Sequence, residues 1–449
     1  MEPSKRIKTN LSSSTTILDL PSDPLLLILS RLDKIDLRSL SLVSKPFLHL
    51  SNHFVRKLTF KTLPDDRSFT HIFNRFSSVN QINLSTEHVD HALIAISKSQ
   101  LNLEALKITN CPTYPEKQQM LSLSGKLKIK SLSLVWFSKA KVDQVVEFIR
   151  LFPLLEELYF GFSYKWDDAG IERLSSMVPN LRKIDLSRNL RLTDRSLYAL
   201  SVNCVNLEYI CIAGCDKLTP QGFCTFLLGC RNLRYLDLPC YSPFPGSYLL
   251  LAEAISACEN VHHLSIDSSL IRDDTLGIFA KSRASLTSLY MKSYNIRPNI
   301  VYTMTGLSAV LCAFQGLTRL SISLPRPGFH NIVDKRTSEL VKSLPCLIGI
   351  AITSWCPIYA TLFSLIENCP LVKYIFLNMN VSARFRHCKV PMPRLVRKNY
   401  TVEYIRLLPS PDASFKIALA SFCPCLRKNW DGDFPQEAFF PNNPAVDWT

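Results

Sequence analysis

The chain has 449 residues, a hydrophobic fraction of 47% and a formal net charge of +15. This composition excludes a disordered chain of low hydrophobicity and provides enough apolar residues for a large buried core. Only 13 glycines are present, which argues against catalytic sites built on glycine-rich phosphate loops.

The first residues show no secretory signal. Residues 1–16 are polar and basic, carry a Ser/Thr cluster, lack an apolar stretch, and are predicted to be a disordered tail. No run of about 20 uncharged apolar residues follows, so we expect no membrane span. Fifteen cysteines without a secretory signal predict reduced thiols and a location in the cytoplasm and/or the nucleus.

Residues 17–57 predict three short helices. Asp23 and Asp36 are predicted to cap the first two, and Pro46 to open the third. The first helix has apolar residues at helical spacing, namely Leu25, Ile28, Leu29 and Leu32. Three helices in about 40 residues cannot bury every apolar face alone, so either a partner or the rest of the chain should cover some of them.

This region resembles an F-box. The matching residues are Leu20-Pro21, Ile28-Leu29-Ser30-Arg31-Leu32, Asp36-Leu37, Leu42-Val43-Ser44-Lys45 and Phe47. Ser44 and Phe47 replace the usual Cys and Trp, and Pro46 is unusual. The resemblance implies binding to the Skp adaptor, and through it to the cullin, of a Skp–cullin–F-box ubiquitin ligase. The residues expected to contact the adaptor are Leu20, Pro21, Leu25, Ile28, Leu29, Leu32, Leu37, Leu40, Val43 and Phe47.

Residues 58–429 predict a solenoid of about 13 repeats. In each unit an apolar residue is followed by two variable residues and then by apolar–variable–apolar, as in Leu181-Arg-Lys-Ile184-Asp-Leu186. We name the middle apolar residue of each unit its anchor. The anchors are Leu58, Ile82, Leu106, Leu132, Leu158, Ile184, Ile210, Leu236, Leu264, Leu289, Leu320, Ile350, Ile375 and Ile405. The five steps from Leu106 to Leu236 are 26 residues each, and the alternation predicts a strand at every anchor.

A helix is predicted after each strand. Capping residues recur nine positions after an anchor, at Asp167, Thr193, Thr219 and Asp273. Apolar pairs at i, i+3 follow, namely Ile171/Leu174, Leu197/Leu200, Phe223/Phe226 and Leu276/Phe279. The predicted fold class is therefore α/β. Residues 430–449 remain as a C-terminal tail that either caps the last repeat or is disordered.

The units resemble leucine-rich repeats of the cysteine-containing subclass. Cys111, Cys215 and Cys240 follow strands, whereas Cys204, Cys230, Cys258 and Cys369 precede them. The resemblance implies a horseshoe with parallel strands inside and helices outside.

The variable strand residues are predicted to line an exposed inner face. Three long steps place extra residues in Tyr241–Gly246, Tyr294–Thr305 and Arg326–Lys335. Insertions on one side of a solenoid often mark its binding face. The expected substrate contacts are Tyr159, Lys183, Asp185, Tyr209, Tyr235, Asp237, His263, Tyr290, Arg297, Arg326 and Phe329.

The sequence contains no catalytic motif that we recognise, and its cysteine pairs lack the spacing of a zinc site. We therefore expect no enzyme activity, no cofactor and no metal. The leading hypothesis is a substrate-recognition subunit, one copy per ligase complex, that holds a protein substrate. The alternatives are a repeat scaffold without a ligase role, and a small-molecule or inositol-phosphate receptor favoured by the positive charge. Basic residues are scattered, so no nucleic acid is expected.

Overall fold

The computed structural model describes most of the chain. The described residues are 17, 20–62, 66–85, 89–109, 128–135, 141–161, 165–238, 248–268, 271–282, 285–292, 302–325, 330–379, 398–408, 410 and 413–427. The chain divides into two compact units: unit 1 is Met1–Leu106 with Pro115–Lys128, and unit 2 is Lys107–Tyr114 with Ile129–Thr449. No helix among the described residues combines the length and apolarity needed to span a membrane.

Unit 1 opens with the three predicted helices, α1 (Ser22–Leu29), α2 (Lys34–Ser41) and α3 (Lys45–Asn52). Pro46 lies in the first turn of α3, as predicted. The predicted caps Asp23 and Asp36 are wrong, because both lie inside a first turn. Asp33 caps α2 instead, accepting hydrogen bonds from the amides of Ile35 and Asp36 at 2.8 Å each. An Asp within the first turn also suits the helix dipole, so the sequence alone does not separate the two positions.

Strands and helices alternate through the rest of unit 1. The elements are β1 (Lys57–Phe60), α4 (Asp66–Arg75), β2 (Gln81–Ser85), α5 (Asp90–Lys98) and the beginning of β3 (Ala105–Thr109). β1 and β2 are parallel, with anchor Leu58 opposite anchor Ile82. The rings of Phe60 and Phe69, 5.4 Å apart, pack β1 against α4.

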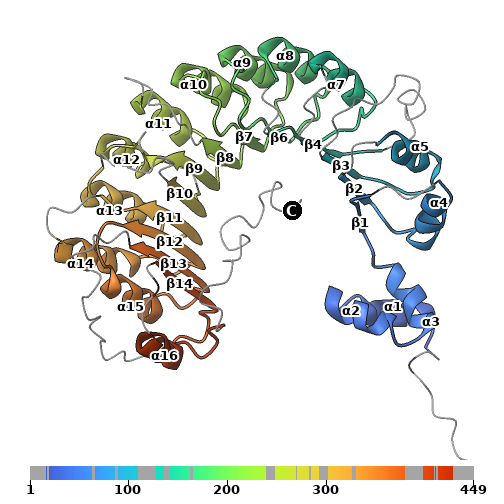
Figure 1. The fold of residues 1–449 in the computed structure, drawn as a ribbon. Coiled ribbons are helices and arrows are strands. Elements are labelled where there is room, and N and C mark those ends of the chain that lie inside the picture. Colours follow the sequence, from blue (N-terminus) through green and yellow to red (C-terminus); the bar gives the residue numbers. More distant parts are fainter. Residues whose placement is uncertain are drawn as a thin grey trace, which may run out of the picture. The chain divides into compact units, whose positions relative to one another are not determined.

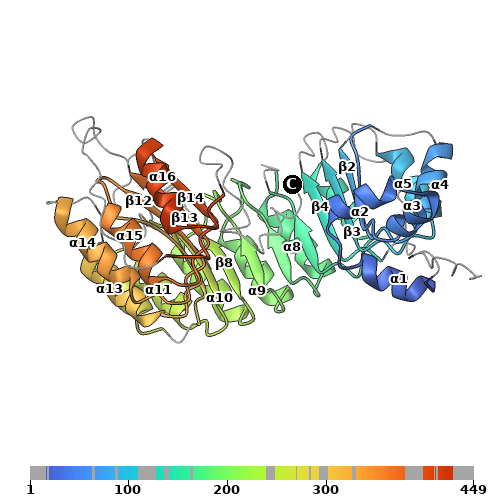
Figure 2. The same ribbon diagram turned by 90° about the horizontal axis from the view of Figure 1, so that it is seen from below.

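Unit 2 repeats the strand–helix alternation (Figures 1 and 2). Its strands are β4 (Ser131–Val135), β5 (Glu157–Tyr159), β6 (Lys183–Asp185), β7 (Tyr209–Cys211), β8 (Tyr235–Leu238), β9 (His263–Asp267), β10 (Ser288–Lys292), β11 (Arg319–Ser323), β12 (Gly349–Ser354), β13 (Tyr374–Met379) and β14 (Tyr404–Leu408). Its helices are α7 (Val142–Ile149), α8 (Asp168–Met177), α9 (Asp194–Asn203), α10 (Pro220–Gly229), α11 (Tyr248–Ser256), α12 (Asp273–Phe279), α13 (Met304–Ala313), α14 (His330–Val341), α15 (Tyr359–Asn368) and α16 (Ala413–Phe422). The strands lie on the inner side of the unit and the helices on the outer side (Figure 1).

The anchor prediction is confirmed by the register of this sheet. From β4 to β14 neighbouring strands are parallel, and each anchor pairs with the next, for example Ile184 with Ile210 and Ile375 with Ile405. All of these anchors are buried, as are the predicted helix pairs. The core therefore lies between the sheet and the helices, and the variable strand residues point to the opposite face of the sheet.

The helices of successive repeats are joined at their first turns. Asp167, Thr193 and Thr219 are N-caps, as predicted. Asp273 is not, because α12 begins at this residue; its carboxylate accepts a hydrogen bond from the amide of Thr303 at 2.7 Å. Asp168 and Asp194 make the same kind of contact with the cap of the next repeat, which sets the spacing of neighbouring helices.

Asp168 gives this arrangement a pH dependence. It accepts hydrogen bonds from the amide and the hydroxyl of Thr193 at 2.9 and 2.6 Å, and from the hydroxyl of Ser196 at 2.6 Å. Burial raises the pKa of Asp168, but these hydrogen bonds outweigh it and lower the pKa below the usual 3.8.

A depressed pKa stabilises the folded state above the ordinary pKa, and this contribution is lost as the pH falls through the folded-state value. Asp168→Asn should therefore lower the free energy of unfolding by about 1 kcal/mol at pH 7, since the site is partly exposed to solvent. The difference from the unsubstituted chain should shrink below pH 3.8. Urea unfolding at pH 7 and pH 3 measures the free energy of unfolding of the variant and of the unsubstituted chain. A difference between them that grows in acid would contradict a lowered pKa of Asp168.

Two of the three predicted long segments are shorter than expected. Helix α13 begins at Met304, inside Tyr294–Thr305, and helix α14 begins at His330, inside Arg326–Lys335. The start of α13 had a readable signal, because Thr303 caps the helix and Met304, Leu307 and Leu311 follow at helical spacing. The segments were instead placed from the lengths of the long steps alone. Tyr241–Gly246 and the remaining residues 294–301 and 326–329 lie outside the described residues.

The cysteines of the described repeats are free thiols. Cys204, Cys230 and Cys369 are fully buried, and burial raises the pKa of each to about 12. A protonated buried thiol does not react as a nucleophile.

Brief treatment of the folded protein with iodoacetamide should therefore modify the exposed Cys312 and Cys425 and leave Cys204, Cys230 and Cys369 intact until the chain is unfolded. Peptide mass spectrometry measures this. Equal labelling of exposed and buried positions before unfolding would contradict the packing.

Candidate functional site

Helices α1–α3 carry an unusual concentration of exposed apolar side chains. Among the described residues, eighteen large apolar side chains are exposed, and seven of them lie between residues 17 and 43. The most exposed of these seven are Ile35, at 74%, Leu42, at 83%, and Val43, at 69%. Ile35 and Leu42 are seven residues apart, so they lie on the same side of α2. We name Leu27, Ile28, Ile35, Leu42 and Val43 the N-terminal apolar surface.

The residues predicted to contact an adaptor divide into two groups. Leu20, Pro21, Ile28 and Val43 are exposed, while Leu32, Leu37 and Leu40 are half-buried. Leu25, Leu29 and Phe47 are buried, so these three hold the helices together rather than extend into solvent. The apolar spacing of α1 predicted one continuous docking stripe. Part of that stripe, Leu25 and Leu29, is instead buried among the three short helices. Leu27, Ile35 and Leu42 are exposed and were missed, because they do not follow that spacing.

The inner face of unit 2 carries a ladder of aromatic rings. The ring centroids of Tyr209 and Tyr235 are 4.4 Å apart, those of Tyr235 and His263 are 3.7 Å apart, and those of His263 and Tyr290 are 4.7 Å apart. Tyr209, Tyr235 and His263 occupy matching positions of β7–β9, and strands lie about 4.8 Å apart, so their rings come into contact. Tyr290 lies two residues further along β10, opposite Ser265, and reaches His263 diagonally. Each ring therefore covers its neighbours.

This stacking changes the predicted inner face. Tyr159, Asp185, Tyr209, Tyr235, His263 and Tyr290 are buried, so the expectation that they are exposed is wrong. Lys183 and Asp237 are half-buried. Lys183 forms an ion pair with Glu157 (Nζ–Oε1 2.7 Å). Arg297, Arg326 and Phe329 lie outside the described residues.

Burial also sets the charge state of this face. It raises the pKa of Asp185, although the amide of Ser187 donates a hydrogen bond to the carboxylate at 2.9 Å. Burial likewise raises the pKa of Tyr209, Cys211 and Tyr290. The tyrosines and the thiol therefore stay neutral near pH 7, and the middle of the sheet presents packed rings rather than free charges.

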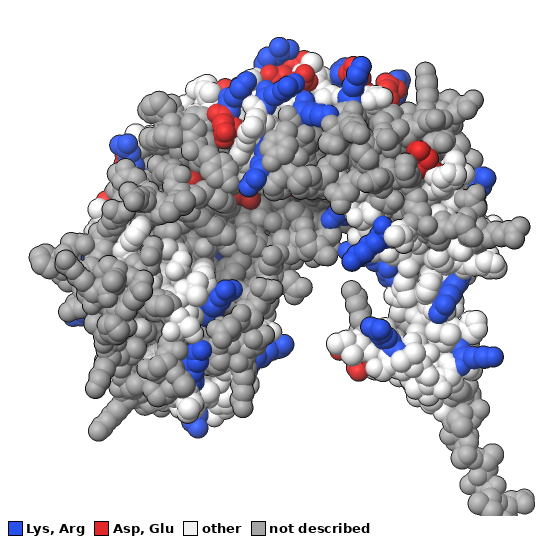
Figure 3. All heavy atoms as spheres, in the orientation of Figure 1, with Lys and Arg blue, Asp and Glu red and all other residues white. Residues whose placement is uncertain are grey.

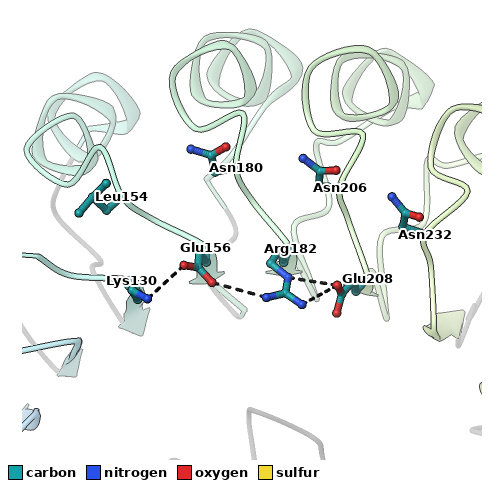
Figure 4. Close-up of a pocket in the computed structure, with 8 residues that line it drawn as sticks. All are labelled: Lys130, Leu154, Glu156, Asn180, Arg182, Asn206, Glu208 and Asn232. Carbon is teal, nitrogen blue, oxygen red and sulfur yellow. Dashed lines mark hydrogen bonds and ion pairs between the residues drawn. The ribbon is translucent and has the colours of Figure 1, made fainter.

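A shallow groove of about 520 Å³ runs along the start of strands β4–β8 (Figure 4). A row of charges of alternating sign follows it, formed by Lys130, Glu156, Arg182 and Glu208, with N–O distances of 3.5, 3.7 and 2.6 Å between successive side chains. Asn180, Asn206 and Asn232 form the second side of the groove. The positive charges are thus offset by neighbouring carboxylates, so this groove has no surplus charge for a polyphosphate.

Sequence reasoning missed this row, although its signal was readable. Lys130, Glu156, Arg182 and Glu208 are 26 residues apart and occupy the same position before each strand. Exposed ion pairs of this kind contribute at most about 1 kcal/mol each, so the row fixes side-chain positions more than it stabilises the fold. Within the described ranges, no three His, Cys, Asp or Glu side chains gather in a way that could hold a metal ion.

Comparison with known proteins identifies one of these regions. A sequence model of the F-box domain matches residues 17–59, which include the N-terminal apolar surface. Among solved structures, the chain resembles one from the Rad7 and Elc1 complex in yeast, with 15% identity, a TM-score of 0.48, and coverage of 94% of this chain and 97% of that one.

Two further structures are similar. The leucine-rich repeat-containing protein LegL7 from Legionella pneumophila has 12% identity and a TM-score of 0.40, with 66% of this chain and 89% of that one covered. A chain of the TLR13–ssRNA13 complex has 11% identity and a TM-score of 0.39, with 79% and 56% covered.

Proposed function

We propose that this chain is the substrate-recognition subunit of a Skp–cullin–F-box ubiquitin ligase. The observation that carries the proposal is the F-box match at residues 17–59, where the described helices also expose Ile35, Leu42 and Val43. An F-box docks a Skp-type adaptor, and large exposed apolar side chains mark protein interfaces. The chain thus contributes binding, and other subunits contribute ubiquitin transfer.

The repeats are proposed to hold the protein substrate. A rigid parallel sheet with helices on one side presents a long second face, which suits a partner of similar length. We also assign the repeats to the cysteine-containing subclass, supported by the buried thiols of Cys204, Cys230 and Cys369. Free thiols throughout the described repeats support a location in the cytoplasm and/or the nucleus.

Affinity purification tests the proposal. The tagged chain is compared with its Leu20→Ala, Pro21→Ala variant, and proteins recovered with each are quantified by mass spectrometry. The Skp adaptor and the cullin should be lost from the variant, while proteins bound to the repeats remain. Undiminished recovery of the adaptor with the variant, or its absence from both samples, would favour a repeat scaffold without a ligase role.

A further inference from the structure

The inner face changes character toward the C-terminal end of unit 2. On β13 and β14 the side chains are half-buried rather than buried, and they combine aromatic rings with arginine. Tyr374 and Tyr404 stack with their ring centroids 5.5 Å apart, and the guanidinium of Arg406 lies 5.9 Å from the ring centroid of Phe376. Arg427 lies 5.0 Å from the ring centroid of Tyr404. We name these five residues the C-terminal inner surface.

This surface is positively charged. Strands β11–β14, the residue before each strand and Arg427 together contain four cations, Arg319, Lys373, Arg406 and Arg427, and one carboxylate, Glu403. Glu403 forms ion pairs with Lys373 at 3.5 Å and with Arg427 at 3.2 Å, so these described positions keep a surplus of 4 − 1 = +3. The charged side chains in view over the C-terminal repeats are mainly Lys and Arg, whereas both signs mix over α8–α10 (Figure 3). The row in the groove of Figure 4 is balanced, so the two ends of unit 2 differ in charge.

The described chain ends beside this surface. The amide of Arg427 donates to the carbonyl of Glu403 at 2.9 Å, as the amide of Glu403 donates to Lys373 at 3.0 Å. The hydrogen bond from Glu403 to Lys373 immediately precedes β14, which begins at the next residue, Tyr404. Arg427, where the described chain ends, therefore lies at the edge of the sheet formed by β14.

Residues 428–449 complement the surface in composition. They contain one lysine against Asp431, Asp433, Glu437 and Asp447, which gives 1 − 4 = −3. Their aromatic residues are Trp430, Phe434, Phe439, Phe440 and Trp448. Acidic and aromatic residues suit a surface of arginine and tyrosine, through ion pairs, ring stacking and cation–π contacts.

We propose that segment 428–449 binds in cis along the C-terminal inner surface, with its carboxylates near Arg406 and Arg427 and its rings against Tyr374, Phe376 and Tyr404. By random-coil statistics a chain of 22 residues spans roughly 25 Å, and strands are about 4.8 Å apart, so β14 and β13 are within reach of the segment. Tethering gives the segment an effective concentration of about millimolar, which makes even a weak contact persistent. The proposal does not depend on F-box docking.

Limited chymotryptic digestion of the full 449-residue chain tests the proposal. The rate of cleavage after Phe439, the one phenylalanine of the segment that is not followed by proline, is measured by mass spectrometry and reports how often the segment is released. Arg406→Glu combined with Arg427→Glu should raise this rate roughly five- to tenfold, as expected for the loss of two charge contacts. Adding Asp431→Arg and Asp433→Arg should restore slow cleavage. Arg150→Glu with Arg195→Glu, two exposed arginines on the helical side, is the matched control and should leave the rate unchanged.

Three outcomes would overturn the proposal. One is equal cleavage of the chain and the Arg406/Arg427 variant, with circular dichroism showing both folded. Another is failure of the charge exchange to restore protection, which would assign the effect to damage of the surface. The third is protection that disappears on dilution, which would mean that the segment binds a second copy of the chain.

Discussion

Ile210→Ala should lower the free energy of unfolding of unit 2 by about 2–5 kcal/mol. Ile210 is fully buried at the middle of β7 and pairs with Ile184 and Leu236 on the neighbouring strands. Removing its outer carbons loses apolar burial and leaves a cavity that the two adjacent anchors cannot fill, since the 26-residue spacing fixes them in register. In a repeat protein the damage also weakens the interfaces on both sides.

The midpoint of urea unfolding, followed by circular dichroism, measures this effect. Ile417→Ala is the matched control, because Ile417 lies on α16 with 73% of its surface exposed. The control should change the free energy of unfolding by less than about 0.5 kcal/mol. Equal midpoints for the two variants would mean that the anchors do not form the core.

Leu42→Asp combined with Val43→Asp should weaken binding of a Skp adaptor at least about 100-fold. Both side chains are among the most exposed apolar groups of the described chain and lie within the F-box match. In the proposed complex two carboxylates would be buried without partners, which costs far more than the lost contacts alone. In the free chain they stay in water, so the fold should be unaffected.

Leu228→Asp is the control for this variant, since Leu228 is an exposed leucine on α10 of unit 2, at 67%. It adds a carboxylate of the same kind outside the F-box match and should leave adaptor affinity unchanged. Surface plasmon resonance with immobilised adaptor gives the dissociation constants of the Leu42/Val43 variant and of the Leu228 variant. Affinities within about twofold of one another would show that the adaptor uses another surface.

The repeat architecture could be predicted from the sequence because one physical rule governs it throughout. Each anchor must be buried beside the previous anchor, so every strand alternates buried apolar residues with variable ones. The pairing of Ile184 with Ile210 could therefore be predicted from the repeat length. Helix starts were predicted less well. Asp273 has the residue type and the spacing of a cap, yet it lies one position inside α12, where an acidic side chain is also favourable.

The candidate surfaces were less predictable because they depend on contacts between repeats. Alternation places Tyr235 and His263 on the inner face, but it cannot show that their rings stack at 3.7 Å and cover each other. Burial of Leu25 and Leu29 likewise depends on how three short helices meet, which their apolar spacing does not specify. The charge row from Lys130 to Glu208 could have been predicted, since its members recur at the repeat length.

Isothermal titration calorimetry of the purified 449-residue chain with a purified Skp adaptor tests the central proposal most directly. The proposed docking of residues 17–59 predicts one adaptor per chain and a dissociation constant below about 1 µM. The heat of binding should disappear when Leu42 and Val43 are replaced by Asp. If the unsubstituted chain gives no heat of binding at two temperatures and adaptor concentrations of about 100 µM, residues 17–59 do not dock the adaptor and the ligase assignment is contradicted.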